Sequence, residues 1–415
     1  MNFSFIHAAD LHLGSPFVGL SSSDLELARR VAAASREALE DLFTRAIELG
    51  VDFVVIAGDV YDGDWKDTTI GHFFNREAAR LEREGIAVYL IRGNHDAESV
   101  ITSAVTLPQS VHVFSARTAE TVKIPELKVA LHGRSFANRA VPENLASSYP
   151  PAEAGWFNIG VLHTSCDGRP PHANYAPCSV QDLVQRGYQY WALGHVHTYE
   201  QLSEQPRIVF PGNLQGRNIR ECGAKGAILV RVEDGEIVES TRLLVGRIRW
   251  ASISADLTGA SSESEAFEII RGTVEQEVDA ADGTPLIFRM TLTGVTTLHR
   301  SFHSFPERVA DEVLSAANHC TDLIWLESVR LETSESIALT AEDDLSLSSL
   351  NLGSMLGPLL ESPGVRTEAR EALDLIKGKF PSMELPEDLF GIDKLAVLLE
   401  EAREALLGSQ MSVEG

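Results

Sequence analysis

Two histidines stand close together after an apolar run in the stretch YWALGHVHTYE, residues 190–200. Gly194 separates the run from His195 and His197. Side chains at positions i and i+2 of an extended chain point to the same side, so the two imidazoles can face one site. A single buried histidine is more often a hydrogen-bonded core residue than a metal ligand. A metal site therefore requires further nitrogen and oxygen ligands elsewhere in the sequence.

Four other apolar runs are also followed by side chains that can bind a metal. Glycine precedes the polar residues after two of these runs, at Gly58 and Gly93, as it precedes His195. Ligands of open α/β sheets bind beyond the carboxyl ends of the strands, so we expect the polar residues to gather in one place. They are Asp10 and His12 after 3–8, Asp59 and Asp62 after 51–58, Asn94, His95 and Asp96 after 86–93, and His163 within 157–164.

The types of side chain in this set indicate which metals they would hold. Carboxylate, imidazole and amide ligands together suit manganese, iron or zinc better than calcium or a structural zinc. A carboxylate can bridge two cations, and Asp59 is central enough in the series to do so. The glycines before Asp59, Asn94 and His195 would let the backbone turn close to the ions.

The order DxH, GDxxD, GNHD, H and GHxH resembles the calcineurin-like metallophosphoesterases, and all five blocks occur here in sequence. The resemblance implies a two-metal site, in which paired ions lower the pKa of a bridging water and clamp the phosphoryl oxygens. It also implies that His95 stands over the substrate phosphate without binding metal and donates a proton to the leaving oxygen. Asp62 and Asp96 are expected to orient His95 or the metal ligands by hydrogen bonds without binding metal themselves. The implied ligands are Asp10, His12, Asp59 and His197 for one ion, and Asp59, Asn94, His163 and His195 for the other.

Two longer stretches indicate which members of this family the chain resembles most. FIHAADLHLGSPF (5–17) and PGNLQGRNIRECGAKGAILV (211–230) are similar to the bacterial DNA-repair exonucleases of the SbcD and YhaO type, over about residues 1–240. The likeness implies two manganese ions, with iron, zinc or magnesium as alternatives. It also implies DNA and an SMC-like coiled-coil ATPase as partners, and a homodimer is a further expected assembly. One departure is that some members of the wider nuclease family carry histidine where this chain has Asp62, which weakens the inference of nuclease activity.

Three functions remain open. The first is a metal-dependent DNA exonuclease or endonuclease that acts in repair or recombination by two-metal hydrolysis. The second is a phosphatase or phosphodiesterase for a small molecule or a protein. The third is a scaffold that has lost activity, and the intact ligand set argues against it. Five basic residues are candidate phosphate or DNA contacts, the alternative being ordinary surface charge: Arg92, Arg134, Arg217, Arg220 and Lys225.

Composition bears on these alternatives. The formal net charge is −25, and residues 251–415 carry 30 acidic and 11 basic side chains. Such a balance counts against DNA binding, which rests on basic surface, although bound metal would neutralise several carboxylates. The N-terminus lacks the basic and apolar regions of a secretory signal, and no apolar stretch is long enough for a membrane span. The four cysteines show no CxxC spacing, so we expect reduced thiols in a cytoplasmic protein without membrane association.

The elements that must position these residues follow from apolar periodicity. Short apolar runs alternate with helical segments over 1–245, which predicts an α/β sandwich, mixed sheets flanked by helices. The resemblance to the calcineurin-like metallophosphoesterases implies that this region is the metallophosphoesterase domain, a β-sandwich flanked by helices. Residues 246–332 predict a small α+β capping domain, and 333–415 a linker with a helical C-terminal tail. Strands are expected at 3–8, 51–58, 86–93, 127–133, 157–164, 188–194, 207–212, 225–233, 249–256, 285–293 and 323–331. Helices are expected at 24–49, 67–84, 262–279, 305–317, 366–378 and 386–407.

Overall fold

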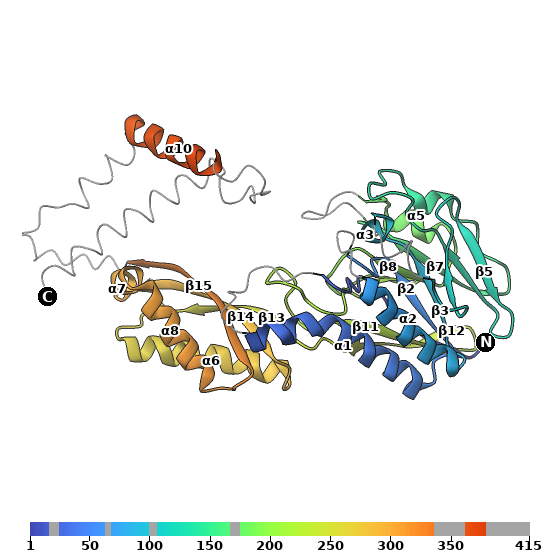
Figure 1. Ribbon diagram of the computed structural model, residues 1–415, viewed down its shortest axis with the longest axis horizontal. Coiled ribbons are helices and arrows are strands. Elements are labelled where there is room, and N and C mark those ends of the chain that lie inside the picture. Colours follow the sequence, from blue (N-terminus) through green and yellow to red (C-terminus); the bar gives the residue numbers. More distant parts are fainter. Residues whose placement is uncertain (16–24, 63–67, 99–105, 167–174, 336–361, 379–415) are drawn as a thin grey trace, which may run out of the picture. The chain divides into compact units, whose positions relative to one another are not determined.

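The structure, a computed structural model, describes six stretches of the 415-residue chain (Figure 1). The chain divides into two compact units, Met1–Ala251 with Ala280–Phe288, and Ser252–Asp279 with Arg289–Gly415. Most of the expected linker and the whole expected helix at 386–407 lie outside the described residues. The described stretches are 1–15, 25–62, 68–98, 106–166, 175–335 and 362–378.

The first unit contains two six-stranded sheets. In the first sheet the strand order is β12-β11-β1-β2-β3-β4, with β1 to β4 parallel to one another. In this sheet β11 runs antiparallel to β1, and β12 antiparallel to β11. The strands are β1 (Phe3–Ala8), β2 (Phe53–Ala57), β3 (Ala87–Ile91), β4 (Val111–Val113), β11 (Gly226–Glu233) and β12 (Glu236–Leu244).

The second sheet has the order β5-β6-β7-β8-β10-β9. Its four inner strands are parallel, and the edge strands β5 and β9 are antiparallel to their neighbours. The strands are β5 (Glu120–Ile124), β6 (Val129–Gly133), β7 (Phe157–His163), β8 (Tyr190–Gly194), β9 (Glu200–Glu204) and β10 (Arg207–Phe210).

The two sheets pack face to face, because their strands are apolar on both sides. Alternate residues such as Phe5 and Phe53 meet Tyr190 of the other sheet in one core, where the rings of Phe5 and Tyr190 are 5.2 Å apart. The intervening residues, among them Ile6, pack against the helices on the outer face. Strands buried on both faces read as continuous apolar runs, which is why these strands are visible in the sequence.

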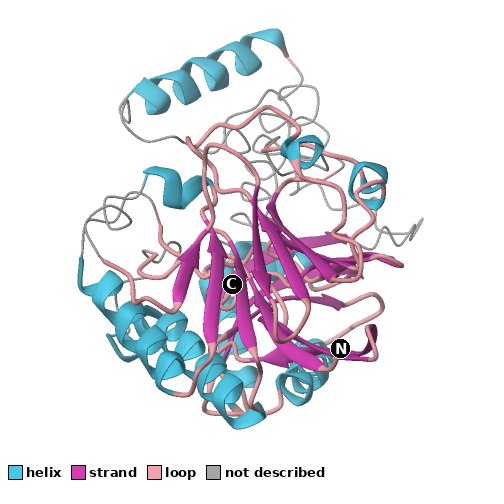
Figure 2. Cartoon of the chain, turned by 90° about the vertical axis from the view of Figure 1, so that its right-hand side faces the viewer, coloured by secondary structure: helices cyan, strands magenta, loops and turns pink. Residues whose placement is uncertain are grey.

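Helices cover the outer faces of this sandwich (Figure 2). Helices α1 (Leu25–Leu49) and α2 (Thr68–Arg83) pack on the first sheet through Phe43 and Phe74. The outer face of the second sheet is covered around Trp191 by α5 (Val180–Val184) and the 3₁₀ turn Leu145–Ser148. The expected β-sandwich flanked by helices is confirmed.

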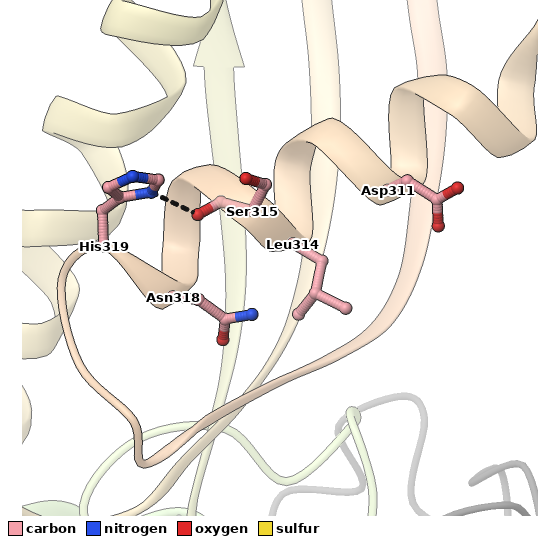
Figure 3. A pocket seen from close by; sticks show the side chains of 5 residues that line it. All are labelled: Asp311, Leu314, Ser315, Asn318 and His319. Atoms are coloured by element: carbon pink, nitrogen blue, oxygen red, sulfur yellow. Dashed lines mark hydrogen bonds between the residues drawn. The ribbon is translucent and has the colours of Figure 1, made fainter.

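The second unit holds most of a three-stranded sheet of order β13-β14-β15. Helix α8 (Pro306–Asn318) is followed by His319, whose Nδ1 donates to the carbonyl of Ser315 (2.7 Å) beside a shallow hollow (Figure 3). No helix among the described residues is long and apolar enough to cross a membrane. The elements here are β13 (Arg249–Asp256), α6 (Glu263–Ala281), β14 (Leu286–Thr296), α7 (His299–Ser304), α8 (Pro306–Asn318), β15 (Ile324–Glu335) and α10 (Pro363–Gly378).

The differences from expectation fall mainly at sheet edges. Strands β4, β5, β9 and β12 were not expected, and each except β12 has five residues or fewer. The helix expected at 305–317 is confirmed as α8, and a short helix that was not expected, α7, precedes it and is separated from it by the start of α8 at Pro306. Proline at the first position of a helix starts a new helix, since it lacks the N–H that a continuing helix needs.

Candidate metal centre

The polar residues at five strand ends meet at one edge of the sandwich. β1, β2 and β3 are parallel in one sheet, and β7 and β8 are parallel in the other. The side chain of His163 at the end of β7 reaches across to β2, where its Nδ1 donates to the carbonyl of Ala57 (2.9 Å). The carboxyl ends of the two sets of strands therefore meet, as the strand-end pattern in the sequence predicts.

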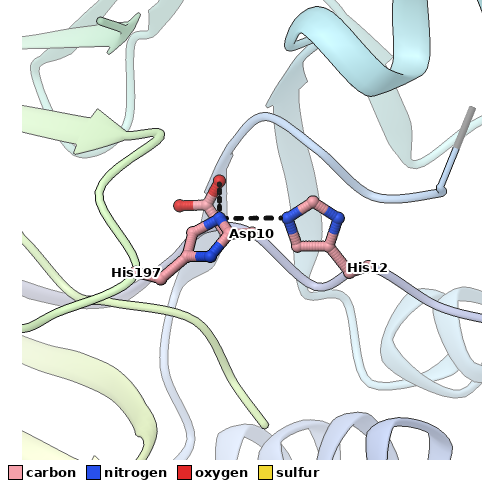
Figure 4. Close-up of side chains that lie close together, drawn as sticks. All are labelled: Asp10, His12 and His197. Carbon is pink, nitrogen blue, oxygen red and sulfur yellow. Dashed lines mark hydrogen bonds and ion pairs between the residues drawn. The ribbon is translucent and has the colours of Figure 1, made fainter. Parts of the chain in front are cut away.

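The first group of candidate ligands is Asp10, His12 and His197 (Figure 4). Nε2 of His12 lies 3.1 Å from Nε2 of His197, and the latter atom lies 3.8 Å from Oδ1 of Asp10. Asp10 and His12 are almost completely buried. Two imidazole nitrogens and a carboxylate that converge in this way form a donor set that suits a divalent transition metal.

The second group is Asp59, Asn94 and His163. Nε2 of His163 lies 3.0 Å from Oδ1 of Asn94 and 3.4 Å from Oδ2 of Asp59. The same oxygen of Asp59 is 4.0 Å from Nε2 of His12 in the first group. Asp59 thus stands between the two groups, in the place that a bridging carboxylate requires.

Hydrogen bonds to the Nδ1 atoms of His163 and His197 determine which ring nitrogen faces the candidate metal site. Nδ1 of His163 donates to a backbone carbonyl, and Nδ1 of His197 donates to Oε1 of Glu221 (2.8 Å). Since these acceptors hold a proton on Nδ1, Nε2 is the nitrogen that faces the carboxylates and that can bind a metal once the ring is neutral. That is the tautomer and orientation in which histidine binds metal.

Ionised carboxylates that are buried together need a positive charge close to them. Burial raises the pKa of Asp59, but His163 and His12 outweigh it and lower that pKa below its usual range. Burial lowers the pKa of His163, whereas Asp59 raises it, with a net pKa of about 9. Buried charges of this kind are stable only when they are paired or bind a metal, so the site fits a cation.

His195 contributes its backbone as well as its ring. Its N–H donates to both carboxylate oxygens of Asp10, at 2.9 and 3.2 Å. Its ring centroid lies 5.2 Å from that of His163 and 5.1 Å from that of Tyr175. The ring therefore stands beside the second group, and the peptide holds a carboxylate of the first.

Four of these residues have a positive φ, a conformation uncommon outside glycine. The φ angles are 51° for Asp10, 42° for His12, 52° for Asp59 and 101° for His195. Such strain costs of order 1–3 kcal/mol per residue and clusters at functional sites, where the surrounding fold enforces it. The four residues follow the ends of β1, β2 and β8, so the strands turn sharply to present their side chains.

His95 lies beside the two groups in a different setting. Its Nδ1 bonds Oδ1 of Asp62 (2.7 Å), and its ring centroid is 4.9 Å from that of His12. Burial lowers the pKa of His95, but the bond to Asp62 and the charge of Asp59 raise it above the ordinary value. The side chain remains 29% exposed, so it can both hold a proton and reach an incoming molecule.

The two supporting aspartates act in different ways. Asp62 holds His95 and also accepts from the hydroxyl of Ser15 (2.6 Å). Asp96 accepts from the backbone N–H groups of Val60 (3.1 Å), Tyr61 (2.9 Å) and Gly93 (3.1 Å). Its described contacts are therefore with the two loops that carry the ligands. The charge of Asp59 also acts on this carboxylate, since burial and then Asp59 raise the pKa of Asp96 to about 6.

The five candidate phosphate contacts do not form one surface patch. Lys225 is buried, its Nζ donates to the carbonyl of His197 (2.8 Å), and burial lowers its pKa to about 8. Arg217 pairs with Glu221 and Asp62. Nη1 of Arg134 donates to a serine hydroxyl, Arg92 is half-buried and Arg220 is exposed. Lys225 thus contacts the His197 loop from a buried position, where a phosphate contact, or else ordinary surface charge, was expected.

Sequence reasoning missed Glu221, which lies behind His197. Glu221 accepts from His197, from Nδ2 of Asn213 (2.9 Å) and from the N–H of Arg217 (2.8 Å). Burial raises the pKa of Glu221, but the bonds from His197 and Arg217 outweigh this and lower it. A metal-binding histidine usually donates its other nitrogen to a carboxylate, so a glutamate in the loop after the last histidine was the available signal.

Gly93→Ala is expected to weaken metal binding about 10- to 100-fold, the usual cost of displacing a ligand's support. A Cβ on Gly93 would lie 2.2 Å from Oδ1 of Asp59, so the carboxylate must turn away from its place between the two groups. Calorimetric titration with Mn²⁺ measures the effect. Gly272→Ala in α6, where nothing lies within 4 Å, is the control that should bind like wild type. Equal affinities for the two variants would contradict the bridging position of Asp59.

The fold and this donor set define a class of protein, the metal-dependent phosphoesterases. Residues 3–199 match the family described as calcineurin-like phosphoesterase, and residues 250–334 match the family described as metallophosphoesterase YhaO, middle domain. The chain is 30% identical over 422 residues to the uncharacterized metallophosphoesterase YhaO of Bacillus subtilis, an alignment that covers 99% of this chain and 98% of that protein. The chain therefore belongs to the calcineurin-like metallophosphoesterase family and is YhaO-like along its length.

More distant similarities extend to a DNA-repair protein and to a solved phosphatase. The DNA double-strand break repair protein Mre11 of Methanopyrus kandleri is 26% identical over 292 residues, which is 64% of this chain and 62% of that protein. A dimetal phosphatase structure from Danio rerio is 12% identical, with a TM-score of 0.35 over 59% of this chain and 99% of that one.

Proposed function

We propose that this phosphoesterase is a manganese-dependent DNA nuclease that acts in repair or recombination. The observation that carries the proposal is the pair of adjacent donor groups, between which Asp59 and Asp10 both lie, with the partly exposed imidazole of His95 beside them. The partial similarity to Mre11 supports DNA as the substrate. An SMC-like ATPase, a homodimer and a cytoplasmic location are parts of the same proposal.

The proposed ligand sets follow the two groups. A divalent pair supplies charge stabilisation and a water of lowered pKa when bound. The chain's own residues would hold that pair, and the close backbone approaches at Gly58, Gly93 and Gly194, where a Cβ would clash, keep the ligands close together. The first ion would be held by Asp10, His12, Asp59 and His197, and the second by Asp59, Asn94, His163 and His195.

His95 is the proposed proton donor. Because Asp62 holds Nδ1, Nε2 is the nitrogen that can face a bound phosphoester. The raised pKa keeps the ring protonated over a wider pH range than a free histidine. The charged ring can stabilise charge that develops on the phosphoryl group, and Nε2 can then pass its proton to the leaving oxygen.

A second candidate is hydrolysis of a small-molecule or protein phosphoester. The charge of the chain favours it, because a net charge of −25 repels the DNA backbone. The burial of Lys225 and the pairing of Arg217 also leave less basic surface beside the site than the sequence suggests. The choice between the two candidates therefore depends on the rate of DNA cleavage relative to that of a small diester.

Purified protein is expected to cleave labelled single- or double-stranded DNA with Mn²⁺ and not with a chelator. A bis(nitrophenyl) phosphate, assayed at the same enzyme concentration, measures turnover of a small diester. The nuclease proposal predicts a higher kcat/KM for DNA, since extended substrates contribute binding energy that a small diester lacks. A small diester or monoester hydrolysed much faster than DNA would instead establish the second candidate.

A further inference from the structure

Two carboxylates are hydrogen-bonded to the histidines that serve as a metal ligand and as the proton donor in the proposed function. Glu221 accepts from Nδ1 of His197, a candidate ligand, and Asp62 bonds Nδ1 of His95, the proposed proton donor. Each carboxylate fixes the orientation of its ring. Both rings are neighbours of His12, whose ring centroid is 4.9 Å from each of theirs.

A single guanidinium connects these two supports. Nη2 of Arg217 lies 2.7 Å from Oε1 of Glu221, and Nη1 lies 3.7 Å from Oδ2 of Asp62. Nη1 also reaches the hydroxyl of Ser15 (3.5 Å), which itself donates to Asp62. The side chain of Arg217 is 18% exposed and that of Glu221 is 8% exposed, so this network lies largely out of water.

We propose that Arg217 is a positioning residue that ties the proton donor His95 to the metal ligand His197 through Asp62 and Glu221. The proposal rests on the hydrolytic function proposed above, and it replaces the expectation that Arg217 contacts a substrate phosphate. Arginine suits this task, because its planar fork offers several donors in fixed directions and can hold two carboxylates at once. The ammonium of lysine is a single point and cannot span both.

The inference gains support from the backbone around the same loop. The N–H of Arg217 donates to Oε2 of Glu221, and Nδ2 of Asn213 donates to the same oxygen. Lys225 holds the carbonyl of His197 from the other end of the loop. The loop therefore contacts both the ring and the backbone carbonyl of His197. Arg217 connects the same loop to Asp62.

The test compares Arg217→Gln and Arg217→Lys with wild type in two independent measurements. The first is Mn²⁺ affinity by calorimetry without substrate, which we expect to fall about 10-fold or more in both variants, the usual cost of removing a partner that orients a ligand. The second is steady-state kinetics on the best phosphodiester, with kcat expected to fall and KM to stay within about 2-fold, as for an interaction made in the transition state. Arg231→Gln, which removes an exposed arginine paired with Glu239, controls for the lost charge and should match wild type in both.

A phosphate-binding role would give the opposite pattern. KM would then rise with kcat and Mn²⁺ affinity unchanged, and this result would overturn the proposal. If wild type hydrolyses no phosphoester, the proposed function fails, but the calorimetry still decides whether Arg217 supports the metal site. If Arg217→Gln does not fold by circular dichroism, Arg217→Lys decides the matter, and unchanged Mn²⁺ affinity in that variant refutes the link to His197.

A double-mutant cycle tests the link to His95. Asp62→Asn and Arg217→Lys, alone and together, should be non-additive in kcat, since both act on the same ring. Additive effects on log kcat would show that Arg217 does not act through Asp62.

Discussion

Asp59→Asn is expected to lower kcat/KM about 10³-fold or more, because it removes a carboxylate that lies between the two donor groups. Charge stabilisation by a metal pair supplies several kcal/mol, and each 1.36 kcal/mol is a factor of ten in rate. Asparagine keeps the shape of the side chain and an oxygen for the N–H of His95, which donates to Oδ1 of Asp59 (2.9 Å). The loss would therefore come from the missing charge and not from a disturbed loop.

Calorimetry and kinetics together decide this prediction. Wild type should bind two Mn²⁺ ions and the variant fewer, or with much lower affinity. Asp234→Asn is a closely matched control, since Asp234 is exposed and has a φ of 51° beside the 52° of Asp59. That variant should keep both ions and full activity. Two tightly bound ions in Asp59→Asn would show that the two groups do not share this carboxylate.

The core strands and the ligands beyond them were predictable for the same physical reason. A strand buried on both faces is a continuous apolar run, and the polar residues that end it stand out against it. Residues 3–8 and 51–58 show this plainly, since Asp10 and Asp59 are the first charged residues after them. The parallel arrangement then brings the ends together without any further signal.

The edge strands were not predictable in this way. β12 (Glu236–Leu244) has one face toward water and carries three charged residues among its nine, so no apolar run marks it. β9 (Glu200–Glu204) is polar along most of its length and pairs only with β10. Pairing with the adjacent strand, β11 for β12 and β10 for β9, holds such strands in place, and no apolar pattern of their own marks them.

The residues that are hydrogen-bonded to the site histidines were the least predictable part of the site. Glu221 and Asp62 act on histidines 24 and 33 residues away, and Arg217 reaches back to Ser15 across 202 residues. No local spacing encodes contacts of this kind. The basic residues in that loop were therefore interpreted as phosphate contacts, although in the fold Arg217 pairs with Glu221 and Asp62, and Lys225 donates to the carbonyl of His197.

The second large effect expected is a 10²- to 10⁴-fold loss of kcat on DNA for His95→Asn, the usual contribution of a general acid. Asparagine places an amide near the position of Nδ1, so it can keep a bond to Asp62 while it removes Nε2. Mn²⁺ binding should be unchanged, in contrast to Asp59→Asn. His72→Asn, at an exposed position of α2, is the control and should behave as wild type. A variant that lost its metal would show that His95 is a ligand.

The leaving group distinguishes proton donation by His95 from simple charge stabilisation. The deoxyribose alkoxide that leaves from DNA is strongly basic and needs a proton in the transition state, whereas nitrophenolate is stable as an anion and needs little help. If Nε2 of His95 donates the proton, His95→Asn should lose far more activity on DNA than on the nitrophenyl diester. If the ring acts only by its positive charge on the phosphoryl oxygens, which are the same in both substrates, the two losses should be equal. The loss of activity on DNA divided by the loss on the nitrophenyl diester therefore measures the contribution of proton transfer. General damage to the site would lower both activities by the same factor and would cancel in this ratio.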